Sequence, residues 1–171
     1  MLIAPERIVT RRLVGTRYTP ADEADVLELN ADVEVMRFIE AGGRNTEKVR
    51  GIFARLDAQW SLHGYGYWVL RTPAGEFAGG LVIIREQVSG DAEAGYALRP
   101  SFWGQGYASE AMTELVRVAF EVLRMPSLFA RVVPENVASV KVLQKLGFVF
   151  EREGVDDKGV RLNFYRLRST G

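Results

Sequence analysis

A glycine-containing loop, Trp103–Ala108, lies between a strand-like run and a long amphipathic helix pattern. The run Ala92–Leu98 reads as a short strand that the following proline ends, because proline cannot extend a β-ladder. From about residue 106 to 124, apolar residues recur at helical spacing. Gly104 and Gly106 leave backbone N–H groups unobstructed at the start of that helix, where such groups can surround a phosphate. This order of strand, loop and helix favours a nucleotide-like ligand.

Two glycines alone are a weak signal, because many strand-to-helix turns use glycine only for its positive φ. A dinucleotide-binding domain would place its glycine loop in an early βαβ unit, whereas this loop follows an antiparallel meander. A P-loop would close with Gly-Lys-Ser or Gly-Lys-Thr, and this loop does not. These exclusions leave a pyrophosphate-bearing ligand held by backbone amides, without a lysine clamp or an evident metal-binding acid.

Apolar periodicity and turn residues divide the chain into short strands and four helices. The predicted strands cover residues 8–18, 65–71, 77–85, 92–98, 128–133, 148–152 and 162–167. The predicted helices run from Thr19-Pro20 to about 30, from 46 to 62, from 106 to 124 and from 136 to 146. We therefore predict an α/β fold with a mixed, largely antiparallel sheet of about six to seven strands, flanked by about four helices.

The length and composition of the chain limit the kinds of protein it can be. With 171 residues, 47% of them hydrophobic, we expect one domain over residues 1–171. The 22 basic and 22 acidic residues cancel, so we expect neither nucleic acid nor an anionic membrane as a partner. The absence of cysteine excludes disulfides, thiolate metal sites and a cysteine acyl-enzyme. Charges interrupt the N-terminal apolar residues and no run is long enough for a membrane span, so we expect a cytoplasmic protein.

A second motif begins at Asn136, where the next helix is predicted to start. On that helix Asn136, Ser139, Val140 and Leu143 share one stripe, which aligns two polar side chains with apolar ones. Taken alone, Asn136 reads as an N-cap and Ser139 as a small packing residue.

Four short signatures follow one another along the chain: Glu93–Tyr96, Pro100–Ala111, Asn136–Ser139 and Lys145–Phe148. Together they resemble the GNAT acyltransferase superfamily, and within it the branch of ribosomal-protein N-terminal acetyltransferases, whose order they keep. Their order and spacing are more specific than any one motif. The resemblance covers most of the chain, is strongest from Tyr65 to Arg168, and implies a GNAT-like fold that agrees with the predicted elements.

The resemblance implies acetyl-coenzyme A as co-substrate, with no metal. The pantetheine arm is expected along Ala97 and Leu98, with Asn136 hydrogen-bonded to it and Ser139 beside it. Much of the superfamily has arginine or glutamine at the first loop position, and the uncharged residue here makes phosphate binding depend more on backbone donors. The pyrophosphate is expected on Trp103, Gly104, Gln105, Gly106, Tyr107 and Ala108.

Acetyl transfer to an amine needs a neutral nucleophile, a polarised thioester carbonyl and a proton for the departing thiolate. The resemblance implies that a backbone N–H at about Leu98 polarises the carbonyl. Glu93 is the candidate base, directly or through a water, and an exposed surface residue is the alternative interpretation. Many members carry a tyrosine where this chain has Leu143, so Ser139 is the candidate proton donor, with water as the alternative.

The acceptor amine is expected on the side opposite the cofactor, lined by Phe38, Ile39, Tyr67 and Tyr165. A protein or peptide N-terminus, a small amine such as an amino sugar or polyamine, and an amino acid all remain open, as do a monomer and a homodimer. The lone His63 reads as a C-terminal cap or loop residue.

We expect an acetyl-coenzyme A-dependent N-acetyltransferase that uses direct transfer in a ternary complex. The alternative is a catalytically silent coenzyme A-binding module. Glu93 and Ser139 argue for the enzyme, and Leu143 favours the silent module.

Overall fold

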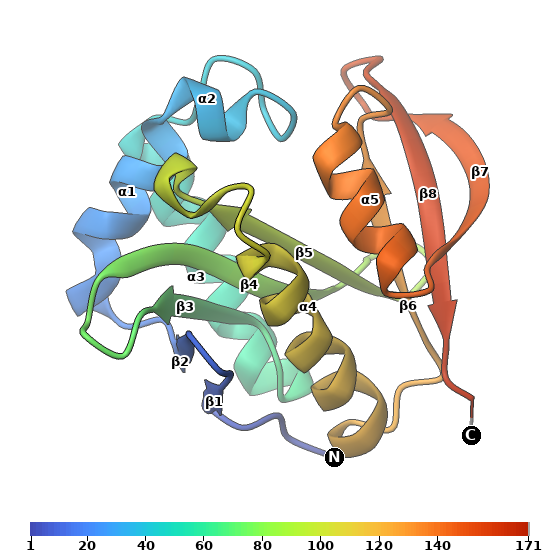
Figure 1. Ribbon diagram of the computed structural model, residues 1–171, viewed down its shortest axis with the longest axis horizontal. Helices are drawn as coiled ribbons and strands as arrows, with labels where there is room; N and C mark the ends of the chain where they lie inside the picture. The colour runs from blue at the N-terminus through green and yellow to red at the C-terminus, as the bar shows by residue number, and fades with distance from the viewer. Residues whose placement is uncertain (171) are drawn as a thin grey trace.

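Eight strands form one sheet in the computed structural model, which describes residues 1–170 (Figure 1). The strands are β1 (Arg7–Val9), β2 (Val14–Arg17), β3 (Tyr67–Arg71), β4 (Phe77–Arg85), β5 (Ala92–Leu98), β6 (Ser127–Val132), β7 (Val149–Val155) and β8 (Arg161–Arg168). The helices are α1 (Glu23–Ala31), α2 (Val33–Met36), α3 (Thr46–His63), α4 (Tyr107–Arg117) and α5 (Val137–Lys145), with short 3₁₀ turns at Pro20–Asp22 and Pro100–Phe102 and a π-helical turn at Val118–Val122.

The sheet opens at its one parallel pair. Its strand order is β1-β2-β3-β4-β5-β6-β8-β7, and every neighbouring pair is antiparallel except β5 and β6. These two strands are joined at a single register pair, Glu93 with Phe129. Residues 94–98 of β5 and 130–132 of β6 therefore have no ladder between them. We call this gap in the ladder the β5/β6 opening.

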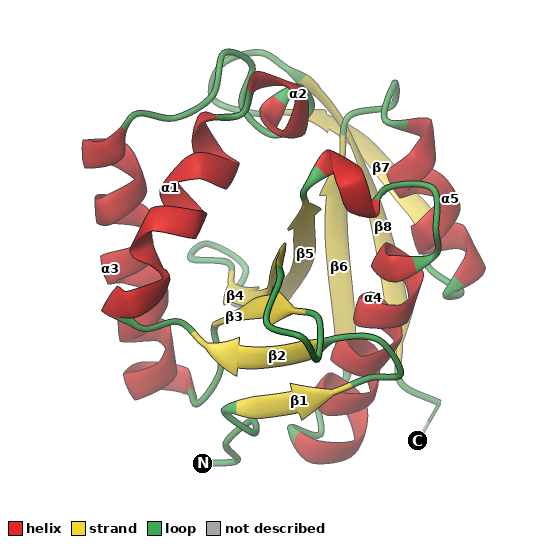
Figure 2. Cartoon of the chain, turned by 60° about the vertical axis from the view of Figure 1, so that its left-hand side comes forward, coloured by secondary structure: helices red, strands yellow, loops and turns green. Residues whose placement is uncertain are grey.

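Helices cover both faces of the sheet, with α4 and α5 on one face and α1 and α3 on the other (Figure 2). The alternation of strand side chains produces two cores. On β3, Trp68 and Leu70 belong to the larger core, which includes Leu115 of α4. Val69 belongs to the smaller core, which includes Phe53 of α3. Each face of the opening therefore has its own helical layer.

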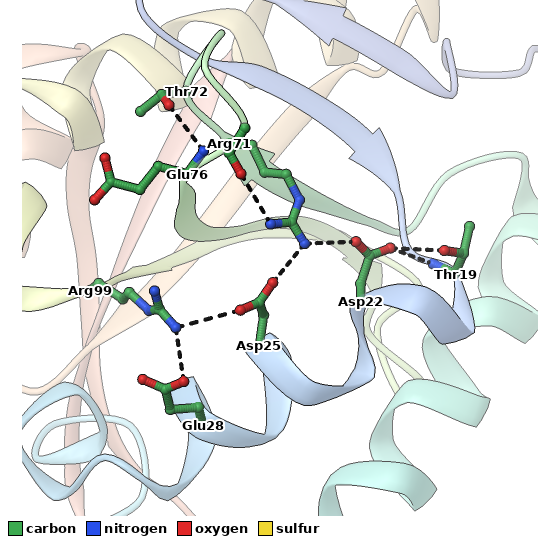
Figure 3. A network of polar contacts seen from close by, with 9 residues as sticks. Thr19, Asp22, Asp25, Glu28, Arg71, Thr72, Glu76 and Arg99 are labelled. Atoms are coloured by element: carbon green, nitrogen blue, oxygen red, sulfur yellow. Dashed lines mark hydrogen bonds and ion pairs between the residues drawn. The ribbon is translucent and has the colours of Figure 1, made fainter.

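Ion pairs hold α1 against the sheet beside the opening (Figure 3). Arg71, the last residue of β3, contacts Asp22 at 3.0 Å and Asp25 at 2.7 Å. Arg99, which directly follows β5, lies 3.0 Å from Glu28 and 3.5 Å from Asp25. A single exposed ion pair contributes little to stability. Asp25, however, pairs with both Arg71 and Arg99, so it links α1 to the ends of β3 and β5.

Most predicted elements are confirmed, and the differences have local causes. The strand predicted over 8–18 is a hairpin, because the side chain of Thr10 accepts the N–H of Leu13 at 3.0 Å and closes a turn there. The unpredicted α2 is a single turn capped by Asp32, which accepts the N–H groups of Glu34 and Val35. The α-helical hydrogen bonding predicted to 124 ends at Arg117 and gives way to the π-helical turn. The sheet thus has eight strands, and five α-helices flank it.

Candidate functional site

The first turn of α4 has no side-chain cap. Its N-cap is Gly106, with φ of +82°, and Gly104 has φ of +68°, both in the left-handed region that favours glycine. By contrast, Asn45 caps α3 and Asn136 caps α5 through their side chains. The N–H groups at the start of α4 are therefore available to an anion at the positive end of the helix dipole.

Side chains of the loop itself fix its shape. The indole Nε1 of Trp103 donates to the carbonyl of Leu98 at 2.8 Å, and Gln105 Nε2 donates to the carbonyl of Ser101 at 2.7 Å. Trp103 supplies no charge, as the sequence indicated, but it anchors the loop to the end of β5. The glycine loop and the β5/β6 opening are thus joined as parts of one site.

The sequence reasoning missed Arg12, which brings a cation to this loop. Its Nη1 donates to the carbonyl of Gln105 at 3.0 Å, and its guanidinium lies 3.9 Å from the centroid of the Tyr107 ring. Its Nε donates to Glu110 in the first turn of α4 at 2.7 Å. Burial acts to raise the pKa of Glu110, but hydrogen bonds from Thr10 and Arg12 outweigh it and lower that pKa. One signal in the sequence could have found Arg12: Glu110 lies in the turn where a phosphate is expected, and a carboxylate there needs a cationic partner.

On β5, the backbone N–H and C=O groups of every second residue point into the β5/β6 opening. The N–H of Arg99 donates to the carbonyl of Ala78 on β4, and groups two residues apart on an antiparallel strand point to the same side. The main-chain groups of Tyr96 and Leu98 therefore point away from β4, and the Leu98 carbonyl accepts the indole of Trp103 there. This orientation suits the expected role of the Leu98 N–H.

The same register corrects the expectation for Ala97. It pairs with Gly80 of β4, so its main chain faces the neighbouring strand, and its side chain packs with the smaller core. Tyr96 is therefore the residue that joins Leu98 in offering backbone groups to the opening.

Asn136 and Ser139 come together at the start of α5. The side-chain oxygen of Asn136 accepts the N–H of Ser139 at 3.2 Å, so the N-cap interpretation of Asn136 is confirmed. Its use of that oxygen leaves the amide NH₂ to donate to a ligand.

Tyr96 reaches Ser139 across the opening, with its phenolic oxygen 3.2 Å from the serine hydroxyl. Burial raises the pKa of Tyr96, and the bond to Ser139 partly offsets that rise. Leu143 is 3% exposed in the larger core, so no polar group stands at that position. Side chains alternate along a strand, so Tyr96 lies on the face opposite to that of Glu93 and Ala97, and this alternation in the sequence could have identified it.

Glu93 lies at the closed end of the opening. Arg131 of β6 binds its carboxylate through two hydrogen bonds, of 2.9 and 2.7 Å. The Glu93 side chain is 17% exposed, so it is not simply a solvated surface residue. Arg131 therefore fixes the position of the Glu93 carboxylate at this end of the opening.

Of the four residues predicted to line the acceptor side, three are compatible with that side and one is not. Phe38 and Ile39 follow α2 and are half-buried and exposed, respectively. Tyr67 packs edge-on against Phe53 of α3, and burial raises its pKa. Tyr165 requires a correction: it is 5% exposed in the larger core on the α5 face, because its strand parity points it away from the acceptor side.

Other features lie away from this site. A cavity of about 340 Å³ is lined by His63, the last residue of α3, together with Tyr65, Arg85 and Leu123. Within residues 1–170, no three His, Cys, Asp or Glu side chains are grouped to hold a metal ion. None of the helices in that part of the chain has the length and apolar character needed to cross a membrane.

A family model described as an acetyltransferase (GNAT) domain matches residues 12–149. The FsC-acetyl coenzyme A-N(2)-transacetylase of Aspergillus fumigatus is 31% identical over 131 residues, which are 71% of this chain and 55% of that protein. The chain thus spans little more than half the length of that relative.

Solved structures share the fold over nearly the whole chain. An acetyltransferase from Agrobacterium tumefaciens superposes with a TM-score of 0.84 at 23% identity, covering 99% of this chain and 98% of the other. RimL, a ribosomal L7/L12 alpha-N-protein acetyltransferase solved in complex with coenzyme A, superposes with a TM-score of 0.80 at 18% identity, covering 94% and 96%. At such identities the likeness shows the fold alone.

Proposed function

The chain belongs to the GNAT acetyltransferase family, and from this we propose that it moves an acetyl group from acetyl-coenzyme A to a primary amine by direct transfer in a ternary complex. The observation that carries the proposal is the position of the uncapped start of α4 beside the β5/β6 opening. The indole of Trp103 thereby connects the start of α4, which can bind an anion, to the end of β5, whose backbone groups face the opening.

The described residues fit the co-substrate. The loop from Gly104 to Ala108 would hold the pyrophosphate through backbone N–H groups, with Arg12 balancing the charge of Glu110. The main-chain groups of Tyr96, which also face the opening, would pair with the amides of the pantetheine arm. When bound, acetyl-coenzyme A supplies an acetyl group activated as a thioester.

Three groups around the opening have the chemistry for transfer. The N–H of Leu98 stabilises the negative charge that develops on the carbonyl oxygen. Glu93, directly or through a water, takes a proton from the attacking amine as the C–N bond forms. As the C–S bond breaks, the sulfur takes the electron pair, and Ser139 provides its proton.

For the acceptor we propose a protein or peptide N-terminus or a small amine, on the face covered by α1, α2 and α3. RimL acts on a ribosomal protein and the Aspergillus relative carries an N(2)-transacetylase name, and both names fit a primary amine. The balanced charge of this chain does not favour a polycationic acceptor. A ribosomal-protein terminus and a cytoplasmic location stay predictions from the sequence.

Isothermal calorimetry with acetyl-coenzyme A and coenzyme A tests the proposal. Gly106→Glu should abolish binding, since it adds a side chain and a negative charge at φ of +82°. The matched control is Gly75→Glu, at φ of +93° on the turn between β3 and β4, with nothing within 4 Å of an added Cβ. Absence of binding by folded wild type would overturn the proposal.

Release of free thiol in the presence of peptide and small-amine acceptors then tests the transfer. Turnover with an amine supports the enzyme. Binding without turnover by any amine class would indicate the silent coenzyme A-binding module.

A further inference from the structure

Tyr96 occupies a position that the proposed chemistry does not yet use. It lies on β5 between Glu93, the last residue paired with β6, and Leu98, where the strand ends. Its ring packs at the edge of the larger core on the face that carries α4 and α5. Its hydroxyl bonds to Ser139 of α5, so this contact spans the β5/β6 opening on the cofactor side.

A serine hydroxyl alone is a poor proton source for a thiolate. Its loss of a proton leaves an alkoxide, which is a much stronger base than the thiolate it would protonate. A phenol has an ordinary pKa of about 10, and although burial raises the pKa of Tyr96, its hydroxyl is still a far stronger acid than an aliphatic alcohol and can return a proton to Ser139. The nearest phenol to Ser139 is Tyr96, at 3.2 Å.

We propose that Tyr96 is the positioning residue of the proton-donor side and acts through Ser139. The Tyr96 hydroxyl donates to the serine oxygen, which leaves the hydrogen of Ser139 to point into the β5/β6 opening. The inference rests on the proposed function, because it concerns the leaving sulfur of that reaction.

The proton passes from Tyr96 through Ser139 to the leaving sulfur. As the C–S bond breaks, its electron pair goes to sulfur, and the hydrogen of Ser139 moves to that sulfur. The hydrogen of Tyr96 moves to the Ser139 oxygen, and the resulting phenolate regains a proton from solvent. Leu143, at the position where many family members have a tyrosine, contributes no proton. Tyr96 would thus supply a phenol from β5 in place of one from α5.

The first measurement is the pKa of the thiol of coenzyme A bound to the protein, read from the ultraviolet absorbance of its thiolate. Donors aimed at sulfur stabilise the thiolate, so Tyr96→Phe should raise this pKa by about one unit, a tenfold change in ionisation. Tyr65→Phe is the control, because it removes the hydroxyl of another buried tyrosine, one that faces Arg85 and not Ser139. If bound coenzyme A has the same thiol pKa in Tyr96→Phe as in the wild type, the inference is overturned.

A double-mutant cycle on kcat is the second measurement. Ser139→Ala should lower kcat by about 100-fold and Tyr96→Phe by about 10-fold, with little change in the Kd of acetyl-coenzyme A. Because Tyr96 acts through Ser139, the double variant should be no slower than Ser139→Ala alone. Additive losses would instead assign Tyr96 an independent structural role and contradict the inference.

The two proposals fail in different ways. Wild type that does not bind coenzyme A overturns the proposed function and this inference with it. Wild type that binds coenzyme A and acetylates an amine, while Tyr96→Phe leaves both the thiol pKa and kcat unchanged, overturns only the role of Tyr96.

Discussion

Arg12 and Glu110, 98 residues apart in the chain, form a 2.7 Å ion pair that joins the turn between β1 and β2 to the first turn of α4. Glu110 also accepts hydrogen bonds from the Thr10 hydroxyl and the Arg12 backbone N–H, both at 2.6 Å. The N-terminal hairpin therefore neutralises a carboxylate that would otherwise repel a phosphate at the glycine loop. Under the proposed function, this pairing gives the hairpin a part in cofactor binding.

Arg12→Ala should weaken coenzyme A binding about tenfold in calorimetry, because a partly exposed charge-assisted bond contributes about 1–2 kcal/mol. Arg12→Ala with Glu110→Gln should recover part of the loss, since the repelling charge is gone. Arg17→Ala, which breaks the pairs with Glu6 and Asp57, is the control and should bind normally. A double variant no better than Arg12→Ala would mean that Arg12 binds phosphate itself rather than neutralising Glu110.

Glu93→Gln should lower kcat by about 100-fold while leaving the Kd of acetyl-coenzyme A unchanged, as expected for loss of a general base. Steady-state kinetics with the best amine acceptor, alongside calorimetry, separates the two effects. Glu151→Gln is a matched control, because Glu151 is another strand carboxylate held by an arginine, Arg166, at 2.8 Å. Equal rates for Glu93→Gln and wild type would remove Glu93 from the role of base.

Local sequence patterns predicted the parts of the site that depend on local chemistry. Glycine at 104 and 106 indicated a left-handed loop before a helix, and Asn136 indicated an N-cap, and the structure has both. Strand periodicity likewise predicted β4 and β5 with their observed bounds.

Contacts between distant segments were not predictable in this way. The pairs Arg12 with Glu110 and Arg131 with Glu93 depend on which strands become neighbours, and periodicity carries no such information. The orientation of Tyr165 was missed for a related reason, because one residue of register decides which face a strand side chain takes. The expected single domain stays a prediction.

Two glycine substitutions should change stability in opposite directions. Gly51 lies in α3 with nothing within 4 Å of an added Cβ, so Gly51→Ala should stabilise the protein by about 0.5–1 kcal/mol. At Gly80 an added Cβ would overlap the Tyr67 hydroxyl, so Gly80→Ala should destabilise it by about 1–3 kcal/mol. Urea unfolding measures both, and a Gly80→Ala variant as stable as wild type would show that the Tyr67 ring is free to move aside.

Glu40 links the loop after α2 to the β7–β8 hairpin and should make stability depend on acid pH. Hydrogen bonds from Lys48, Arg44 and Lys158 lower its pKa to about 2 from the ordinary 4.5. A carboxyl whose pKa is lowered by folding contributes its full stability above the ordinary pKa and loses it as pH falls toward the folded value. The Glu40 contribution should therefore be complete above pH 4.5 and disappear toward pH 2.

Because the lysines are partly exposed, Glu40→Gln should cost only about 1 kcal/mol in the free energy of unfolding at pH 7. The gap between wild type and Glu40→Gln should narrow as pH falls below 4.5, as measured by urea unfolding at several pH values. Glu34→Gln, at an exposed carboxylate on α2, is the control for removing one negative charge. A Glu40→Gln gap that stays constant between pH 7 and pH 3 would mean that Glu40 stabilises the loop by packing and not by its charge.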